Sequence, residues 1–197
     1  MEEFTRFNDT CRSITIELLK HLSDNLGLSE GKRLEDGHRE GHASNSCLNL
    51  IRYERGTDSQ YFGLNKHTDN GTLTLLLTDQ WGLQVLSKET EKWEFVEPKP
   101  GHAVINVADT LRFLSGLQFR SAVHRAEPIW EEGQTHRFSF GYFLRAEDEH
   151  VFPTLNGEVM TAKEWHDRKY TNYQAPHSVQ NKNHILLGGM EQLVATS

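Results

Sequence analysis

The chain has 197 residues, of which 36% are hydrophobic and 25% are charged, and its formal net charge is −7 at pH 7. A chain of this length can fold around one core, so we expect a single domain over residues 1–197. The acidic balance argues against an extended nucleic-acid-binding face, which needs concentrated lysine and arginine. A local basic pocket for an acidic cosubstrate is still compatible with this charge.

The sequence has no segment that predicts a membrane span or export. No apolar run approaches the ~20 residues needed to cross a bilayer, and the acidic first three residues are unlike a signal peptide. Cys11 and Cys47 form neither a disulfide framework nor a CxxC pair, so both are interpreted as small buried hydrophobes in a reducing compartment. We therefore expect a cytoplasmic protein, monomeric, without membrane or nucleic-acid partners.

Residues 3–26 are predicted to form an amphipathic helix. Apolar side chains recur there at steps of three or four, and Gly27 follows as a C-terminal stop. Residues 29–46, rich in glycine and charge, are predicted to form a connector in which the side chains of His38 and Glu40 stay solvated. We expect the apolar stripe of the helix to pack on this protein's own sheet. The stripe consists of Phe4, Phe7, Cys11, Ile14, Leu18, Leu22 and Leu26.

From residue 48 onward, short β-prone stretches alternate with turn residues, and no helical segment separates them as a parallel sheet would require. Eight such candidates with short spacers are typical of a double-sheet jelly roll. After them, Thr161 and Glu164 have the spacing of a capping box, which predicts a C-terminal helix with Trp165 and Tyr170 on its inner side. The strand candidates are 48–53, 72–77, 83–86, 93–96, 103–107, 111–113, 121–126 and 135–144.

Two histidines and one aspartate are placed so that they can share a metal ion. His67 and Asp69 precede a predicted strand, and side chains two apart on an extended backbone point the same way. His124 lies on a later strand that can return to the same rim. Two imidazoles and one carboxylate leave three metal positions open, as non-haem Fe(II) oxygen chemistry requires. Structural zinc sites take four protein ligands instead.

A second motif lies on the last predicted strand. Arg137 and Ser139 are two residues apart, so both can face the interior. A guanidinium fork and a hydroxyl bind a carboxylate well, and a buried arginine without such a partner would be costly. The pair therefore predicts a carboxylate site beside the metal.

Together, these motifs resemble the 2-oxoglutarate/Fe(II)-dependent oxygenases of the isopenicillin N synthase-like superfamily. The resemblance implies a mainly β fold, a double-stranded β-helix (jelly roll) with flanking N-terminal and C-terminal helices. It implies a leading helix within 1–30, a jelly-roll core over 48–145 and a C-terminal segment over 146–197. Members usually carry roughly a hundred further residues before this helix, and from the resemblance we expect that N-terminal segment to be absent here. The matching runs are 67–77, 82–85, 100–109, 121–125 and 137–139.

The resemblance also implies roles for individual residues. His67, Asp69 and His124 would be the catalytic iron ligands. Arg137 and Ser139 would hold the distal carboxylate of 2-oxoglutarate. Tyr53 would line the cosubstrate or substrate site, and Phe143 would meet the substrate. Ile51 stands where many plant members carry asparagine. His102, Asn106 and Asp109 are interpreted as structural.

The implied activity is that of an oxidoreductase, a non-haem Fe(II) dioxygenase. It would use O2 to couple oxidative decarboxylation of 2-oxoglutarate to the hydroxylation or other oxidation of a small organic metabolite, in secondary metabolism and with ascorbate supporting activity. Two alternatives stay open: an oxidase of the same superfamily that needs no 2-oxoglutarate, and a catalytically silent binding module. A zinc-dependent cupin-like hydrolase is a more distant one.

Overall fold

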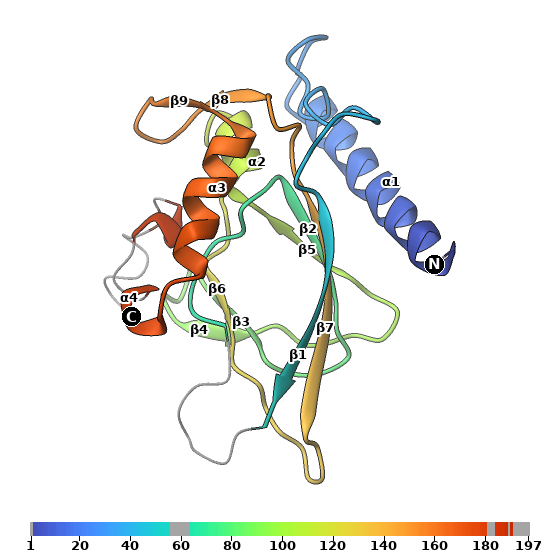
Figure 1. The fold of residues 1–197 in the computed structure, drawn as a ribbon, viewed down its shortest axis with the longest axis vertical. Coiled ribbons are helices and arrows are strands. Elements are labelled where there is room, and N and C mark those ends of the chain that lie inside the picture. The colour runs from blue at the N-terminus through green and yellow to red at the C-terminus, as the bar shows by residue number, and fades with distance from the viewer. Residues whose placement is uncertain (1, 56–63, 181–183, 189, 191–197) are drawn as a thin grey trace.

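The structure is a computed structural model that describes residues 2–55, 64–180, 184–188 and 190 (Figure 1). Its strands form a four-stranded sheet in the order β1-β7-β2-β5, a three-stranded sheet in the order β4-β3-β6 and a β8-β9 hairpin, all antiparallel. The strands are β1 (Cys47–Glu54), β2 (Leu73–Leu77), β3 (Leu83–Leu86), β4 (Trp93–Phe95), β5 (Val104–Val107), β6 (His124–Ala126), β7 (His136–Leu144), β8 (Val151–Pro153) and β9 (Val159–Thr161). The helices are α1 (Glu2–Asn25), α2 (Asp109–Leu114), α3 (Ala162–Tyr173), α4 (His177–Gln180) and the 3-10 helix η1 (His184–Leu187).

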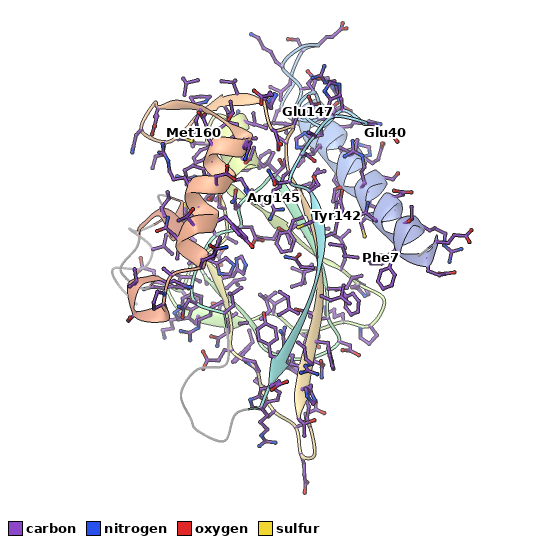
Figure 2. All side chains as sticks on the ribbon, viewed as in Figure 1. Phe7, Glu40, Tyr142, Arg145, Glu147 and Met160 are labelled. Atoms are coloured by element: carbon purple, nitrogen blue, oxygen red, sulfur yellow. The ribbon has the colours of Figure 1, made fainter. Side chains whose placement is uncertain are left out.

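Helices lie on both sides of the strands (Figure 1). α1 packs on β2 and β7 of the four-stranded sheet, and Figure 2 shows Tyr142 of β7 between the strands and this helix. α3 stands on the opposite side of the molecule, against η1 and the β8-β9 hairpin that carries Met160. No helix among the described residues is long and apolar enough to cross a membrane.

The register of β1 against β7 decides which side chains face the interior. Tyr53 lies opposite Arg137 and Ile51 lies opposite Ser139. Because side chains alternate along a strand, these two pairs share one face and the residues between them share the other. Phe138, on that other face, is 48% exposed, whereas Arg137 and Ser139 are buried. The candidate carboxylate-binding pair therefore points inward, as predicted.

One predicted strand is wrong, because residues 111–113 belong to helix α2. Leu111 and Phe113 pack into different apolar clusters, one with α1 and one with α3. Residues two apart on a helix point in nearly opposite directions, whereas on a strand they would share one face. All residues from Asp109 to Phe113 are buried, so no polar side of the helix reveals its period. A short run buried all round cannot be assigned from periodicity.

The leading helix forms where it is predicted, but it buries a different face. Thr15 and Ser23 are buried although polar, whereas Phe4 and Ile14 of the predicted stripe are exposed. The hydroxyls can be buried because each has a partner: Thr15 Oγ1 donates to the Cys11 carbonyl, and Ser23 Oγ donates to Glu35. The buried row is Cys11, Thr15, Leu19 and Ser23, with Phe7, Leu18, Leu22 and Leu26 packed beside it.

The two cysteines differ in burial. Cys11 is buried in the main core, as expected. Cys47 is only partly buried, and its Sγ lies 3.1 Å from Nη1 of Arg145. The expectation of a buried apolar side chain is therefore wrong for Cys47, because β1 is the edge strand of its sheet in the part of the chain that the structure describes.

The capping box at Thr161 and Glu164 is confirmed, and Trp165 is buried as predicted. Tyr170 is 50% exposed and stacks on His166, so its predicted inward orientation is wrong. The reason is geometric: residues five apart on a helix lie about 140° apart around its axis.

The connector 29–46 has no helix or extended strand, as predicted, but it packs more closely than expected. Glu40 is exposed, whereas His38 is only 4% exposed and its Nε2 lies 2.8 Å from Oγ1 of Thr72. The prediction that His38 stays solvated is therefore wrong. Arg39 explains why, since its guanidinium pairs with Glu147 and fixes the connector on the body of the protein.

Burial of His38 predicts a pH-dependent stability. Burial, with His150 and Arg12 nearby, lowers the pKa of His38 from 6.5 to about 4. Between those two values the unfolded chain binds the proton more readily than the folded one, so stability falls as the pH drops from about 6.5 toward 4. We expect His38 to account for a loss of about 2 kcal/mol between pH 7 and pH 5. Urea unfolding of the wild type and of His38→Gln measures it; an identical loss in both proteins would contradict the assignment.

Candidate metal centre and adjoining cavity

Three side chains from two distant parts of the chain meet at one point. His67 and Asp69 lie just before β2, and His124 begins β6. An isolated antiparallel bridge joins the two histidines, with both backbone N–H···O distances at 2.9 Å. Nε2 of His67 lies 3.6 Å from Oδ1 of Asp69, and Nε2 of His124 lies 3.5 Å from the same oxygen. Within the described ranges, this is the one group of three or more such side chains that could hold a metal ion.

The backbone fixes the orientation of both imidazoles. Nδ1 of His67 lies 2.7 Å from the Asn65 carbonyl oxygen, and Nδ1 of His124 lies 3.0 Å from that of Ala122. A carbonyl oxygen only accepts, so Nδ1 carries the proton and the lone pair of Nε2 is free to bind a metal. Burial and the neighbouring His67 lower the pKa of His124, which keeps its ring neutral.

The carboxylate of Asp69 has one oxygen occupied and one oxygen directed at the histidines. Oδ2 accepts hydrogen bonds from Oγ1 of Thr74 and Nδ2 of Asn106, both at 2.7 Å. Burial works to raise the pKa of Asp69, but the two histidines and Thr74 outweigh it and hold that pKa below its usual value. Asp69 is therefore ionised, and Oδ1 is the oxygen presented for a metal.

The donor set fits a ferrous ion. It offers two imidazole nitrogens and one carboxylate oxygen, and it contains no sulfur. This is the 2-His-1-carboxylate arrangement of non-haem iron oxygenases, whereas structural zinc sites are closed by four ligands that usually include cysteine. Asn106, interpreted above as structural, also orients a ligand; its position opposite Thr74 on the paired strand β5 explains this.

A cavity of about 200 Å³ adjoins the three side chains and extends between the two larger sheets. Its lining is mostly apolar, with side chains such as Leu76, Leu83 and Val85. All seven residues proposed from the sequence line it, namely Tyr53, His67, Asp69, His124, Arg137, Ser139 and Phe143. The folded chain therefore brings the two motifs to one chamber.

Arg137 gives this cavity a buried positive charge. The residue is 2% exposed, and its Nε donates to the Trp81 carbonyl at 2.9 Å. Burial lowers the pKa of Arg137, and the interaction that opposes this comes from Tyr53 rather than from a carboxylate. Its guanidinium carbon lies 5.1 Å from the centroid of the Tyr53 ring. Because no carboxylate from residues 2–55, 64–180, 184–188 or 190 pairs with this buried cation, the cavity favours a bound anion.

Tyr53 and Ser139 complete the polar end of the cavity. Burial raises the pKa of Tyr53, and Arg137 and Ser139 only partly offset that effect, so the phenol stays protonated. Gly82 leaves room for the arginine, because a Cβ there would lie 2.9 Å from Nε of Arg137. Tyr53, Ser139 and Arg137 thus provide two hydroxyls and a guanidinium at one end of the chamber.

Phe143 lies farther along β7 than Arg137 and Ser139 and lines the same cavity. It stands opposite Thr74, the residue that orients Asp69. A Cβ at Gly141 would lie 2.8 Å from the Phe143 ring, so the glycine makes room for that ring. His102, in contrast, is exposed and bonds only near its own turn, to Pro100, consistent with a structural interpretation.

Sequence comparison identifies the family. The model of the 2OG-Fe(II) oxygenase superfamily matches residues 44–146. The chain is 46% identical to the 2-oxoglutarate-dependent dioxygenase iboH of Amanita muscaria, covering 98% of this chain and 95% of that protein. It is 45% identical to the 2-oxoglutarate-dependent dioxygenase frbH of Dothideomycetidae sp., covering 95% of this chain and 59% of that one. The chain spans only 46% to 59% of the length of four curated relatives that it matches, one of which is frbH.

Comparison of folds agrees. The crystal structure of JOX2 in complex with 2OG, Fe, and JA superposes with a TM-score of 0.74 at 23% identity, over 92% of this chain and 55% of that one. The expected mainly β jelly-roll fold class, the expected family and the expected class of enzyme, an oxidoreductase, are confirmed. The chain belongs to the 2OG-Fe(II) oxygenase superfamily.

Proposed function

We propose that this chain, as a single domain, is a non-haem Fe(II) dioxygenase that couples oxidative decarboxylation of 2-oxoglutarate to the oxidation of a small, largely apolar metabolite. One observation carries the proposal: the three metal-ligating side chains line the same cavity as a buried arginine that has no carboxylate partner among the described residues. The metal site and the anion site are thus within reach of one bifunctional acid. Residues Arg137, Ser139 and Tyr53 would bind its distal carboxylate.

His67, His124 and Asp69 would hold the iron through Nε2, Nε2 and Oδ1. A ferrous ion bound there supplies the redox chemistry with O2 and the open positions for the cosubstrate. The Nδ1 hydrogen bonds of both imidazoles orient the rings and direct their Nε2 atoms at the metal position. The protein also keeps Asp69 to a single ligating oxygen, because Thr74 and Asn106 occupy the other. Three protein ligands leave the remaining positions open.

The cavity lining indicates the class of substrate. Ile51 lies opposite Ser139 and lines the chamber with an alkyl group, where many plant members would place an amide. Apolar pockets with few convergent polar groups bind apolar ligands and exclude water from the reaction. We therefore propose a small apolar metabolite, with Phe143 against it, and a role in secondary metabolism. We also propose that the protein is a cytoplasmic monomer and that ascorbate, as a reductant, supports its activity.

The hydrogen bonds to Oδ2 of Asp69 give a test of the metal centre. Asn106→Leu and Thr74→Val keep the shape of each side chain but remove its donor. We expect each to weaken Mn(II) binding by about 10- to 100-fold, as loss of a partner to a metal ligand does elsewhere. Isothermal titration measures the affinity, with Thr10→Val on the exposed side of α1 as control. Unchanged affinity in both variants would mean that Asp69 is oriented in another way.

The experiment that tests the function is 2-oxoglutarate turnover. Purified protein with Fe(II), ascorbate and O2 is incubated with a library of small apolar metabolites, and succinate is quantified. Substrate-stimulated succinate supports the proposal. Substrate oxidation without succinate would instead establish the 2-oxoglutarate-independent oxidase. Fe(II) binding without turnover, at an affinity that 2-oxoglutarate does not change, would establish a silent binding module. Activity with zinc alone would establish a hydrolase.

A further inference from the structure

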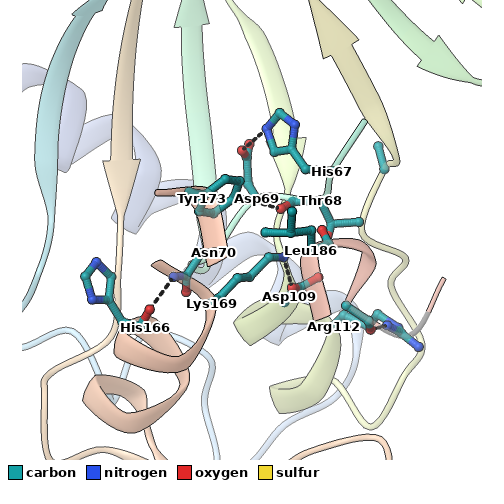
Figure 3. A network of polar contacts seen from close by, with 12 residues as sticks. His67, Thr68, Asp69, Asn70, Asp109, Arg112, His166, Lys169, Tyr173 and Leu186 are labelled. Atoms are coloured by element: carbon teal, nitrogen blue, oxygen red, sulfur yellow. Dashed lines mark hydrogen bonds and ion pairs between the residues drawn. The ribbon is translucent and has the colours of Figure 1, made fainter. Parts of the chain in front are cut away.

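Thr68, between two candidate ligands, is held entirely by the C-terminal part of the chain. Its N–H donates to the Leu186 carbonyl at 2.9 Å, and its own carbonyl accepts from the Tyr173 hydroxyl at 2.9 Å. Its Oγ1 accepts from Nζ of Lys169 at 2.7 Å (Figure 3). All three polar groups of Thr68 thus have partners on α3 or η1. Since neighbouring side chains in extended backbone point to opposite sides, these contacts lie behind the ligand face.

Lys169 connects Thr68 to the first residue of helix α2, Asp109. Lys169 and Asp109 are both fully buried, and Nζ lies 2.5 Å from Oδ2 (Figure 3). The backbone N–H of Asp109 in turn donates to the Asp69 carbonyl at 3.1 Å. Burial lowers the pKa of Lys169, and the carboxylate of Asp109 opposes that shift. The cost of removing both charges from water offsets much of the attraction in a pair this buried, so the pair is weak evidence of net stability.

Gly188 closes the other side of the ion pair. A Cβ at that position would clash with both carboxylate oxygens of Asp109, and the residue has a φ of +55°. Its carbonyl accepts from Nη1 of Arg112 on α2. The turn after η1 is therefore fitted closely around Asp109, which favours one position of the C-terminal segment.

A second chain of contacts reaches His67 from the same segment. Nδ2 of Asn65 donates to Oε1 of Gln180 on α4 at 3.1 Å, and the Asn65 carbonyl is the partner of Nδ1 of His67. The Tyr173 ring also lies edge-on to the His67 ring, with centroids 5.6 Å apart. The C-terminal segment thus contacts one ligand through Asn65 and Tyr173, and both ligands through Thr68.

We propose that Lys169 and Tyr173 are positioning residues that act through Thr68 to hold His67 and Asp69 at metal-binding separation, so that helix α3 sets the affinity for iron. The inference rests on the proposed function, since it takes these two residues as ligands. Its physical basis is that residues 67–69 lie outside the regular strands, with one isolated bridge at His67. Without the contacts to Thr68, the backbone of residues 67–69 would have to become ordered when the metal binds, and the entropy cost of that ordering would lower the affinity.

Co(II) binding to the intact chain tests the inference, because affinity and the ligand-field spectrum report on the site without turnover. Tyr173→Phe removes only the hydroxyl that bonds the Thr68 carbonyl, and it keeps the buried ion pair. We expect it to weaken Co(II) binding about 10-fold, the range seen when groups around metal ligands are altered. Tyr170→Phe, on the exposed side of the same helix, is the matched control and is expected to bind as the wild type does.

The lysine is tested with a paired substitution, because Lys169→Met alone would leave Asp109 buried without a partner. Lys169→Met with Asp109→Leu replaces the ion pair by apolar side chains, which proteins often tolerate. We expect the double variant to melt like the wild type in the absence of metal and yet to bind Co(II) about 10-fold more weakly. The exposed ion pair between Lys163 and Asp167 on the same helix offers a control, Lys163→Met.

The outcomes separate the inference from the function. If the wild type binds Co(II), His124→Ala does not, and Tyr173→Phe binds like the wild type, the positioning role is overturned while the metal centre stands. If the wild type and His124→Ala bind equally, the metal centre itself is wrong and the inference falls with it. A melting temperature lowered by Tyr173→Phe at unchanged Co(II) affinity would show a purely structural role and also overturns the inference.

Discussion

Replacing His124 by alanine is expected to reduce 2-oxoglutarate decarboxylation by more than about 100-fold. Altering a group that merely orients a metal ligand costs 10- to 100-fold in affinity or activity, so removing a ligand costs more. The site would keep one imidazole and one carboxylate, too few to retain the metal. Succinate or CO2 release at saturating Fe(II) measures the effect.

The substitution should leave the fold intact, which makes the result interpretable. The bridge between His67 and His124 consists of backbone hydrogen bonds, and alanine preserves them. The imidazole makes one backbone hydrogen bond, to Ala122. The control is His102→Ala on an exposed turn. Full turnover by the His124 variant would remove it from the metal centre.

Replacing Arg137 by leucine is expected to raise the apparent KM for 2-oxoglutarate roughly a hundredfold. Truncating one partner of a buried, hydrogen-bonded charge pair costs about 2–5 kcal/mol, and 3 kcal/mol is about two powers of ten. Arg137→Lys should recover only part of the loss, because an ammonium keeps the charge but not the planar fork. Initial rates at varied cosubstrate concentration give KM and kcat separately.

The matched control for this variant is Arg52→Leu. Arg52 lies on β1 next to Tyr53, but it points to the exposed side and pairs with Glu54. It is expected to leave the KM for 2-oxoglutarate unchanged. An unchanged KM in Arg137→Leu as well would mean that the buried guanidinium serves a different anion, such as an acidic substrate.

The candidate site could be read from the sequence because its residues follow the period of a strand. His67 and Asp69, like Arg137 and Ser139, are two apart, so a single rule of alternation places each pair on one face. The structure places all four on the cavity, together with His124. Strand pairing within the four-stranded sheet then adds Tyr53, because β1 pairs with β7 and places Tyr53 opposite Arg137.

The parts that could not be predicted depend on contacts that no local period encodes. Helix α2 was predicted as a strand because its buried residues show no polar side. The buried face of α1 includes Thr15 and Ser23, whose hydroxyls become acceptable in the core only through specific partners. His38 is buried because Arg39 reaches Glu147, more than a hundred residues away, and that pairing has no sequence signature.

The surroundings of the metal centre were missed for the same reason. Lys169 lies on a helix with several charged residues and was not singled out from the sequence, yet it is fully buried against Asp109 and Thr68. An alternation or spacing rule cannot find a contact between residues 101 positions apart. A fully buried lysine becomes informative only once the tertiary structure shows what it reaches.

The most direct test of the central claim is a crystal structure of the protein with Mn(II) and 2-oxoglutarate under anaerobic conditions. Anomalous scattering locates the manganese independently of the protein atoms. The account predicts one peak within bonding distance of Nε2 of His67, Nε2 of His124 and Oδ1 of Asp69, with the distal carboxylate of 2-oxoglutarate on Arg137 and Ser139. A peak at other side chains, or a cosubstrate carboxylate bound away from Arg137, would contradict it.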